Sequence, residues 1–223
     1  MTAVGDDAGA RTWASTLQGA LSLPSPRLVR LHCVSRRAPV ALATVAAIGV
    51  GLALLLRAHW DTYGALQLPL VFETAASAVI SIATTGPFGE PERATPRWLP
   101  LLRLGLTLVL GAAAVSALVV AAATAHLAGG SLDVLRNTAG LTGIGLLCAA
   151  WLGGGLAWVG PTGYMLVGLF GLYKDWHGPA LTTPWLWPAR PPHDLGAALC
   201  ASLVFSVGMI VVTFRGPRDR AGE

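Results

Sequence analysis

Charged residues are scarce in this chain: Asp, Glu, Lys and Arg make up only 12% of its 223 residues. An average soluble domain carries about 25% of such residues. Hydrophobic residues, in contrast, account for 54% of the chain. This balance excludes an ordinary soluble globular protein, a disordered chain and a coiled coil, and it indicates an integral membrane protein built of helices.

Lysine and cysteine are also rare. Lys174 is the only lysine, and it does not follow a glycine-rich loop, so the chain has no Walker A motif for binding ATP. None of the three cysteines has metal-ligand spacing to another, and the His and Asp residues between 175 and 194 match no known zinc motif. With no HExxH motif or nucleophile elbow either, the sequence predicts no enzymatic activity, no cofactor and no metal site. The cysteines are Cys33, Cys148 and Cys200.

Apolar runs of the right length for membrane-spanning helices recur along the chain. A span needs about 20 mostly apolar residues. The uncharged stretch 137–173 is too long for one span, and the glycines at 153–155 and the Gly160-Pro161 pair divide it into two. The sequence therefore predicts six spans, at about 38–56, 63–85, 104–125, 138–156, 161–173 and 195–214.

Basic residues set the orientation of these spans. With both termini in the cytoplasm, eleven of the fifteen basic residues lie on the cytoplasmic side and four lie outside. Basic residues that flank spans favour the cytoplasmic side, so the net charge of +4 does not indicate nucleic-acid binding. The richness in Ala, Gly and Leu with so little lysine is typical of a GC-rich bacterial genome. We expect a multi-pass protein of the bacterial plasma membrane with both termini in the cytoplasm.

The predicted fold is an all-α, polytopic membrane helix bundle with six transmembrane helices and a short amphipathic N-terminal helix. This first helix covers 11–23, where Trp13, Leu17 and Leu21 recur every four residues and share one face. The alternative is an unstructured arm with incidental leucines. The expected organisation is a cytoplasmic arm (1–37) with a basic approach to the first span, a transmembrane domain (38–214) and a cytoplasmic tail (215–223).

Glu73 is the only ionisable residue inside an apolar run, about ten residues into the second predicted span. A charge at membrane depth is costly, so it usually faces the bundle interior or a water-filled path. Ser77 and Ser81 follow one and two turns later on the same helical face, which predicts an intramembrane polar site. Three structural roles stay open for Glu73: a place near the membrane edge, a contact between subunits, or support of a kink at Pro69.

Small residues repeat every four positions in the fourth predicted span, at Gly145, Ala149 and Gly153. Small side chains at this spacing let two helices approach closely. We therefore expect a helix-packing face here, either within the subunit or between subunits.

The connection between the second and third predicted spans, 86–103, is long and carries charge of both signs. Its charged residues, prolines and apolar Trp98-Leu99 edge favour a docking element for a cytoplasmic partner. The alternative is a solvated connection whose charges only set the topology. The docking candidates are Glu90, Glu92, Arg93 and Arg97.

On the outside, the connection 174–194 holds Trp176, Trp185, Trp187 and several prolines. Tryptophan favours the membrane–water interface. We expect this segment to form a rigid cap that lies along the outer leaflet.

Taken together, these features resemble the membrane subunit of a type-2 ABC exporter, a permease with six spans. An amphipathic segment precedes the first span, and the segment Glu90-Pro91-Glu92-Arg93-Ala94-Thr95 joins the second and third. A tight glycine-rich turn joins the fourth and fifth spans, and the external segment before the sixth re-enters the interface. The chain departs from the family where Ala94-Thr95 replaces the frequent Gly-Thr, and where prolines interrupt the same segment.

The resemblance implies a permease subunit that moves a small apolar or amphipathic compound with ATP hydrolysed by a separate subunit. In that family the second connection docks on the ATP-binding subunit, which implies a coupling role for Glu90, Glu92, Arg93 and Arg97. Two copies of the chain, or one copy and a second permease, would pair with two ATP-binding subunits in the lipid bilayer. The alternative function is that of a non-transporting membrane protein, an assembly or sensor partner.

Overall fold

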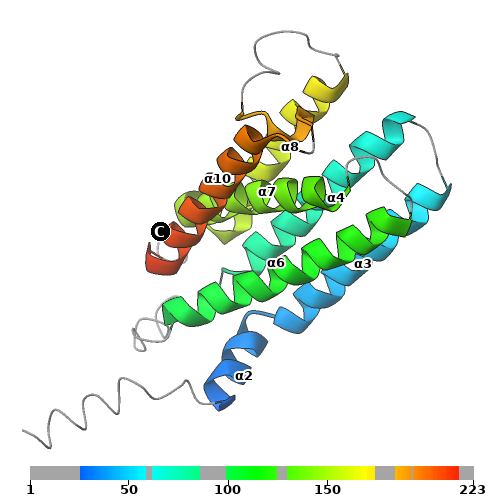
Figure 1. Cartoon of the computed structure of the whole chain (residues 1–223). Coiled ribbons are helices and arrows are strands. Elements are labelled where there is room, and N and C mark those ends of the chain that lie inside the picture. The colour runs from blue at the N-terminus through cyan, green and yellow to red at the C-terminus, as the bar shows by residue number, and fades with distance from the viewer. Residues whose placement is uncertain are drawn as a thin grey trace, which may run out of the picture.

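The chain is described here by a computed structural model that covers residues 26–58, 62–85, 99–124, 130–173, 184–191 and 193–215. Within these ranges every regular element is a helix (Figure 1). The elements are α2 (Pro26–Ser35), α3 (Ala38–Ala58), α4 (Thr62–Ala83), α6 (Leu99–Thr124), α7 (Gly130–Leu152), η1 (Gly154–Leu156), α8 (Val159–Tyr173), η2 (Trp187–Ala189) and α10 (Leu195–Arg215). The expected all-helical fold is thus confirmed for the described part of the chain.

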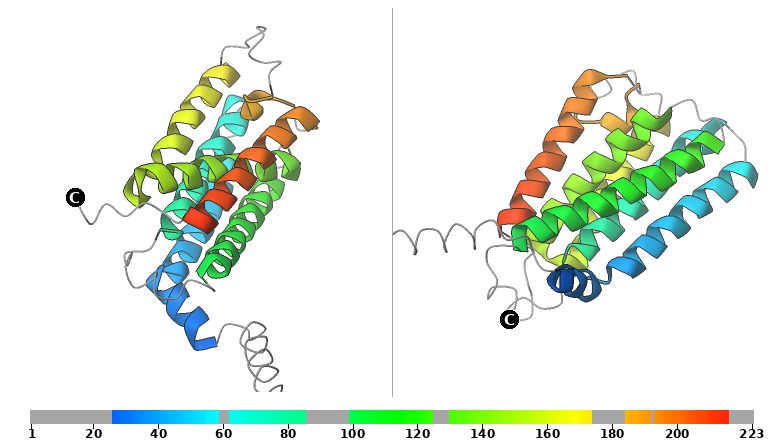
Figure 2. Two further views of the ribbon diagram at one scale, coloured as in Figure 1. Left: turned by 90° about the vertical axis from the view of Figure 1, so that its left-hand side faces the viewer. Right: turned by 60° about the horizontal axis from the view of Figure 1, so that its bottom comes forward.

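The long helices form one bundle with α7 at its centre. α7 contacts α4, α6, α8 and α10, and its contact with α10 is the most extensive in the bundle. α3 lies at one side and packs on α4 and α6 (Figure 2). Figure 1 also places α2 and the last turn of α10 at the same end of the bundle.

Among the described residues, four helical segments are long and apolar enough to cross a membrane: Ala38–Ala58, Leu99–Thr124, Gly154–Leu172 and Leu195–Arg215. They correspond to the first, third, fifth and sixth predicted spans. In α4 the apolar segment is the shorter Gln67–Ala83, and α7 begins with the polar residues Asp133, Arg136 and Asn137. α7 can carry such residues because four neighbouring helices surround it, so its composition need not match that of a lipid-facing helix.

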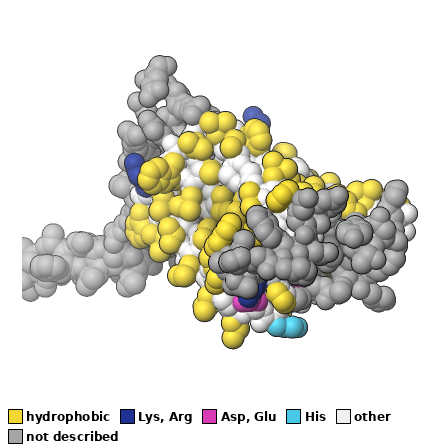
Figure 3. Space-filling model, turned by 90° about the horizontal axis from the view of Figure 1, so that it is seen from above, with side chains coloured by type: hydrophobic (Ala, Val, Ile, Leu, Met, Phe, Trp, Pro, Cys, Tyr) yellow, Lys and Arg dark blue, Asp and Glu magenta, His cyan; other side chains and the backbone are white. Residues whose placement is uncertain are grey.

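Large apolar side chains cover the outside of the bundle, whereas charged ones are few on the face seen in Figure 3. A monomeric soluble protein rarely exposes a contiguous apolar patch of more than a few hundred Å². A surface of this kind is favourable in contact with lipid, which gives the described helices the character of a membrane protein. Exposed examples are Val40, Val50 and Leu54 on α3, Val109 and Val120 on α6, and Leu199, Leu203 and Ile210 on α10.

The main apolar core lies between α3, α4 and α6. Leu52, Ile80 and Leu110 are fully buried there. At Gly49 the α3 backbone approaches α6 so closely that an added Cβ would lie 2.9 Å from Ala117 Cβ. α3 and α6 therefore pack through small residues, as membrane helices commonly do.

The N-terminal part of the chain differs from the expectation in one respect. The predicted amphipathic helix 11–23 lies outside the described residues, and the stretch expected only as a basic approach forms the helix α2. Pro26 is the first residue of this helix, a position that proline tolerates because its missing N–H would have no intrahelical partner. Arg27 and Arg30 are exposed on α2, whereas His32 is buried.

Candidate functional site

Glu73 lies inside the bundle, with its side chain only 1% exposed. It projects from α4 towards α7, where Asn137 is within hydrogen-bonding reach of the carboxyl group and Arg136 and Asp133 act on it electrostatically. Its Oε2 atom has no hydrogen-bond partner among the described residues. Glu73 thus faces the interior of the bundle, in a contact between two helices of the same chain.

Ser77 lies one turn further along the same face of α4 and joins the two helices directly. Its hydroxyl donates to the Thr138 carbonyl at 3.3 Å and accepts a hydrogen bond from the Thr142 hydroxyl at 3.2 Å. Glu73, Ser77, Asn137, Thr138 and Thr142 are all buried, and we call this group the polar seam. The seam brings together residues more than 60 positions apart in the sequence.

Ser81 takes a different role from its two predicted neighbours. Its hydroxyl donates to the Ser77 carbonyl of its own helix at 2.8 Å. An added Cβ at Gly145 would lie 2.1 Å from the Ser81 oxygen, so the two residues form a close contact of α4 with α7. Ser81 therefore extends the seam by packing and adds no hydrogen bond between the helices.

The Thr138 hydroxyl, like Glu73 Oε2, is buried without a hydrogen-bond partner among the described residues. Leaving a buried polar atom unpaired costs about 1–3 kcal/mol. Polar groups at membrane depth mark functional or assembly sites for this reason. What the seam can do chemically is exchange hydrogen bonds between one carboxyl, one amide and three hydroxyl groups as α4 and α7 shift.

Arg136 closes the seam at one end. It is buried, and it donates to the Pro191 carbonyl at 2.8 Å, to the Arg190 carbonyl at 3.1 Å and to the Asn137 side-chain oxygen at 3.4 Å. It also forms an ion pair with Asp133 at 2.6 Å. Arg136 therefore links the seam to the segment 184–191.

Sequence reasoning missed Arg136, Asn137, Thr138 and Thr142. The sequence did contain a signal for them. Thr138, Thr142 and Gly145 recur at helical spacing on one face of the fourth predicted span, and Asn137 directly precedes it. Their placement opposite Glu73 depends on the pairing of α4 with α7, which a single helical pattern does not specify.

We expected the outer cap to lie along the membrane surface. The segment 184–191, which belongs to it, instead packs partly into the bundle. Trp187 in η2 is 2% exposed, and its ring centroid lies 4.5 Å from that of Tyr164 on α8. An added Cβ at Gly140 would lie 2.6 Å from the Trp187 ring, so this glycine makes room for the indole on α7. Trp185, in contrast, is half exposed, as expected of an interfacial tryptophan.

Asp194 caps the start of α10. Its Oδ1 accepts a hydrogen bond from the Ala197 backbone N–H at 3.1 Å, and its other oxygen pairs with the Arg190 guanidinium. The Ala197 N–H and then Arg190 hold the Asp194 pKa below its ordinary value. In the described ranges no group of three or more His, Cys, Asp and Glu side chains is placed to hold a metal ion.

The predicted packing face is divided between different environments. Gly145 contacts α4 through Ser81, and Ala149 is fully buried. Gly153 lies just after the end of α7 with a φ of +87°, where glycine is favoured by conformation. α7 and α10 approach each other closely at Gly143 and Gly208, where a Cβ on Gly208 would lie 2.6 Å from the Gly143 oxygen.

The four predicted docking residues, Glu90, Glu92, Arg93 and Arg97, lie outside the described residues. The structure does place the two helices that they connect. α4 ends at Ala83 and α6 begins at Leu99.

Comparison of the chain with protein-family models, with curated proteins and with solved structures finds no match.

Proposed function

We propose that this chain is the membrane-embedded permease subunit of an ABC-type exporter. The observation that carries the proposal is the pairing of two features at opposite ends of the bundle. One is the helix α2, which packs against the start of α3. The other is the segment 184–191, which folds back onto α7 and α8 before the last helix. The external segment is one of the features on which the resemblance to the family rests, and α2 directly follows the segment 11–23 on which another of them rests.

The proposal includes six spans, with α4 and α7 completing the four apolar segments. The apolar segment Gln67–Ala83 of α4 is shorter than the other four, and it keeps its one charge, Glu73, away from lipid. The polar start of α7 is enclosed by Pro191 and Arg190 through Arg136. Both helices thus bury these polar side chains inside the protein and away from lipid, as is usual for polar residues at membrane depth. The distribution of basic residues favours cytoplasmic termini.

In this mechanism the segment 86–98 receives the movement of an ATP-binding subunit and passes it to α4 and α6. A displacement of α4 moves it against α7 along the polar seam. The two hydrogen bonds between helices in the seam, at 3.2 and 3.3 Å, are long for hydroxyl groups. They can be exchanged at low cost, so the seam suits a sliding contact.

Co-purification tests this function. The tagged protein is isolated in mild detergent from its native host, and the associated proteins are identified by mass spectrometry and ATPase assay. The test variant changes Glu90, Glu92, Arg93 and Arg97 to Ala. The control variant changes Arg215, Arg218 and Arg220 in the C-terminal tail to Ala.

The proposal predicts that an ABC ATPase accompanies the native protein and the tail variant but not the variant of segment 86–98. Its absence from the native preparation, under conditions that preserve other membrane complexes, would contradict the proposal. The alternative of a non-transporting assembly or sensor partner would then describe the chain better.

A further inference from the structure

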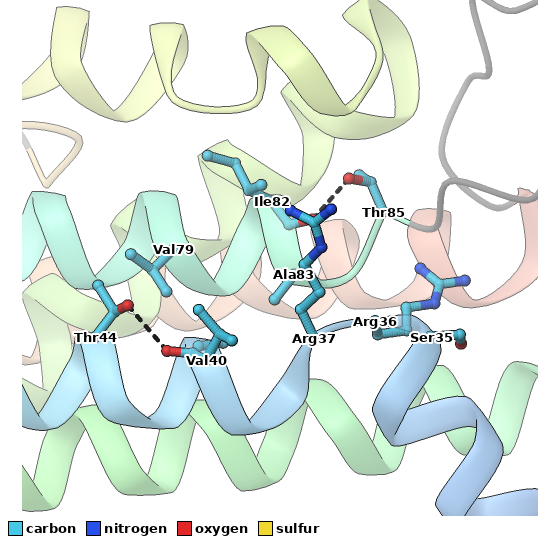
Figure 4. A pocket seen from close by; sticks show the side chains of 10 residues that line it. Ser35, Arg36, Arg37, Val40, Thr44, Val79, Ile82, Ala83 and Thr85 are labelled. Carbon is cyan, nitrogen blue, oxygen red and sulfur yellow. Dashed lines mark hydrogen bonds between the residues drawn. The ribbon is translucent and has the colours of Figure 1, made fainter.

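A pocket of about 440 Å³ lies where the α2–α3 junction meets the end of α4. Figure 4 shows its lining: Arg36 and Arg37 from the junction, Val40 and Thr44 from α3, and Val79 and Ile82 from α4. None of the residues that line it belongs to the polar seam. No acidic side chain is among the described residues that line it.

The pocket has an apolar part on the outside of the bundle. Val40 is 62% exposed and Ile82 is 45% exposed, although both are large apolar side chains. Val79, which is partly buried, continues this surface inwards. An apolar surface of this kind at the side of a membrane protein fits an acyl chain.

The basic part of the pocket comes from two consecutive arginines. Arg36 is buried and donates through its guanidinium to the Thr84 carbonyl at the end of α4. Arg37 is exposed and has a φ of +52°, a left-handed conformation that a long side chain rarely adopts. This residue forms the turn between α2 and α3, and its side chain supplies a second guanidinium to the lining of the pocket, apart from that of Arg36 (Figure 4).

The hydroxyl groups around the pocket already donate hydrogen bonds within the protein. Ser35 donates to the His32 carbonyl, Thr44 to the Val40 carbonyl and Thr85 to the Ile82 carbonyl. Their oxygens can accept hydrogen bonds, whereas the donors for an anion come from the arginines. The chemistry therefore matches a molecule with an anionic group, hydroxyl groups beside it and an apolar tail.

We propose that this pocket binds an anionic phospholipid, with its phosphate at Arg37 and an acyl chain along Val40, Val79 and Ile82. The proposal requires α3 and α4 to meet the membrane surface here, but it needs no ATP-binding subunit. It can therefore fail while the permease proposal stands, and the reverse also holds.

The test is native mass spectrometry of the full chain released from detergent, with phosphatidylglycerol and phosphatidylcholine of the same acyl chains as competing probes. The test variant is Arg37→Asn, because asparagine tolerates the left-handed conformation and preserves the turn. The control is Arg57→Asn, which removes the same charge from an exposed position at the other end of α3.

We expect the native protein to retain phosphatidylglycerol in preference to phosphatidylcholine. Arg37→Asn should weaken phosphatidylglycerol binding about fivefold, as expected for the loss of one arginine at a membrane surface, and Arg57→Asn should leave it unchanged. Equal retention of both lipids, or an equal loss in both variants, would overturn the proposal.

Two further arms separate a lipid from a soluble phosphate. Thr44→Trp fills the apolar part and leaves both arginines in place, so it should weaken lipid binding as well. Inorganic phosphate at millimolar concentration should not displace phosphatidylglycerol from the native protein. Displacement by phosphate, or full lipid binding by Thr44→Trp, would show that no acyl chain occupies the pocket and would contradict the proposal.

Discussion

At the scale of single residues, Glu73 is the most unusual feature of the chain. A carboxyl group that is 1% exposed inside an apolar helix is tolerated here because Asn137 and Arg136 lie beside it. Arg136 donates to Asn137, and Asn137 is within hydrogen-bonding reach of Glu73, so the three side chains form a relay from the segment 184–191 into the bundle.

Replacing Glu73 tests whether the stability of the seam depends on the hydrogen bonds of this side chain or only on its size. Glu73→Gln keeps the size and a hydrogen-bonding oxygen, so its thermal unfolding in detergent should stay close to that of the native protein. Glu73→Ala removes the carboxyl group from Asn137 and opens a cavity, and it should cost about 1–3 kcal/mol or more. Equal melting temperatures for the two variants would contradict a hydrogen-bonded role for Glu73.

Asp194 provides a second prediction at this scale. Asp194→Ala removes the cap of α10 and should lower the melting temperature at pH 7, whereas Asp194→Asn should retain most of the cap. Because folding lowers the Asp194 pKa, its ionised form contributes stability at neutral pH, and this contribution is lost as the pH falls below the ordinary value of 3.8. The difference between the native protein and Asp194→Ala should shrink over that range. A difference that grows on acidification would contradict the assigned role.

At the scale of helices, close backbone contact holds α7 to its neighbours. The Gly143–Gly208 contact leaves no space for a methyl group. Bulk lipid is as apolar as the helix surfaces, so packing and hydrogen bonding drive helix association. The stability of the bundle therefore depends on which glycines lie at helix crossings, and less on how many glycines the chain contains.

Gly208→Ala should destabilise the bundle by about 1–3 kcal/mol, because the added methyl group meets backbone that cannot move aside. The matched control is Gly111→Ala on α6, where an added Cβ has no neighbour within 4 Å. This control should be neutral, or more stable by up to about 1 kcal/mol through helix propensity. Thermal unfolding of both variants in the same detergent measures the difference, and equal losses would show that the crossing is not the cause.

The limits of sequence reasoning are also clearest at this scale. The apolar runs at α3, α6 and α10 are predictable because composition and length alone determine a lipid-facing helix. α2 was not expected as a helix, because its alternation of basic and apolar residues looks like a topology signal. Trp187 was expected at the interface, and its burial depends on the space left by Gly140 on another helix. Half of the seam could be predicted. The helical spacing of Glu73 and Ser77 predicts their side of it, whereas their partners on α7 could not be identified from the pattern of one helix.

At the scale of the whole molecule, the structure is an all-helical bundle with an apolar exterior and a polar seam through its centre. In the part of the chain that the structure describes, four segments are long and apolar enough to span a membrane on their own. α4 and α7 differ because they carry the polar groups that contact each other. The six-span arrangement that we propose, and with it the proposed cytoplasmic position of segment 86–98, depend on these two helices crossing the bilayer.

The most direct measurement of this central claim is labelling of single cysteines with a membrane-impermeant maleimide, in a background where Cys33, Cys148 and Cys200 are replaced by Ala. The reporters are Ala94→Cys, Ala128→Cys and Ala180→Cys. With six spans, intact cells should label positions 128 and 180, and position 94 should react only after the membrane is opened. If α4 and α7 do not cross, positions 94 and 128 exchange sides. Labelling of position 94 but not 128 in intact cells would contradict the account.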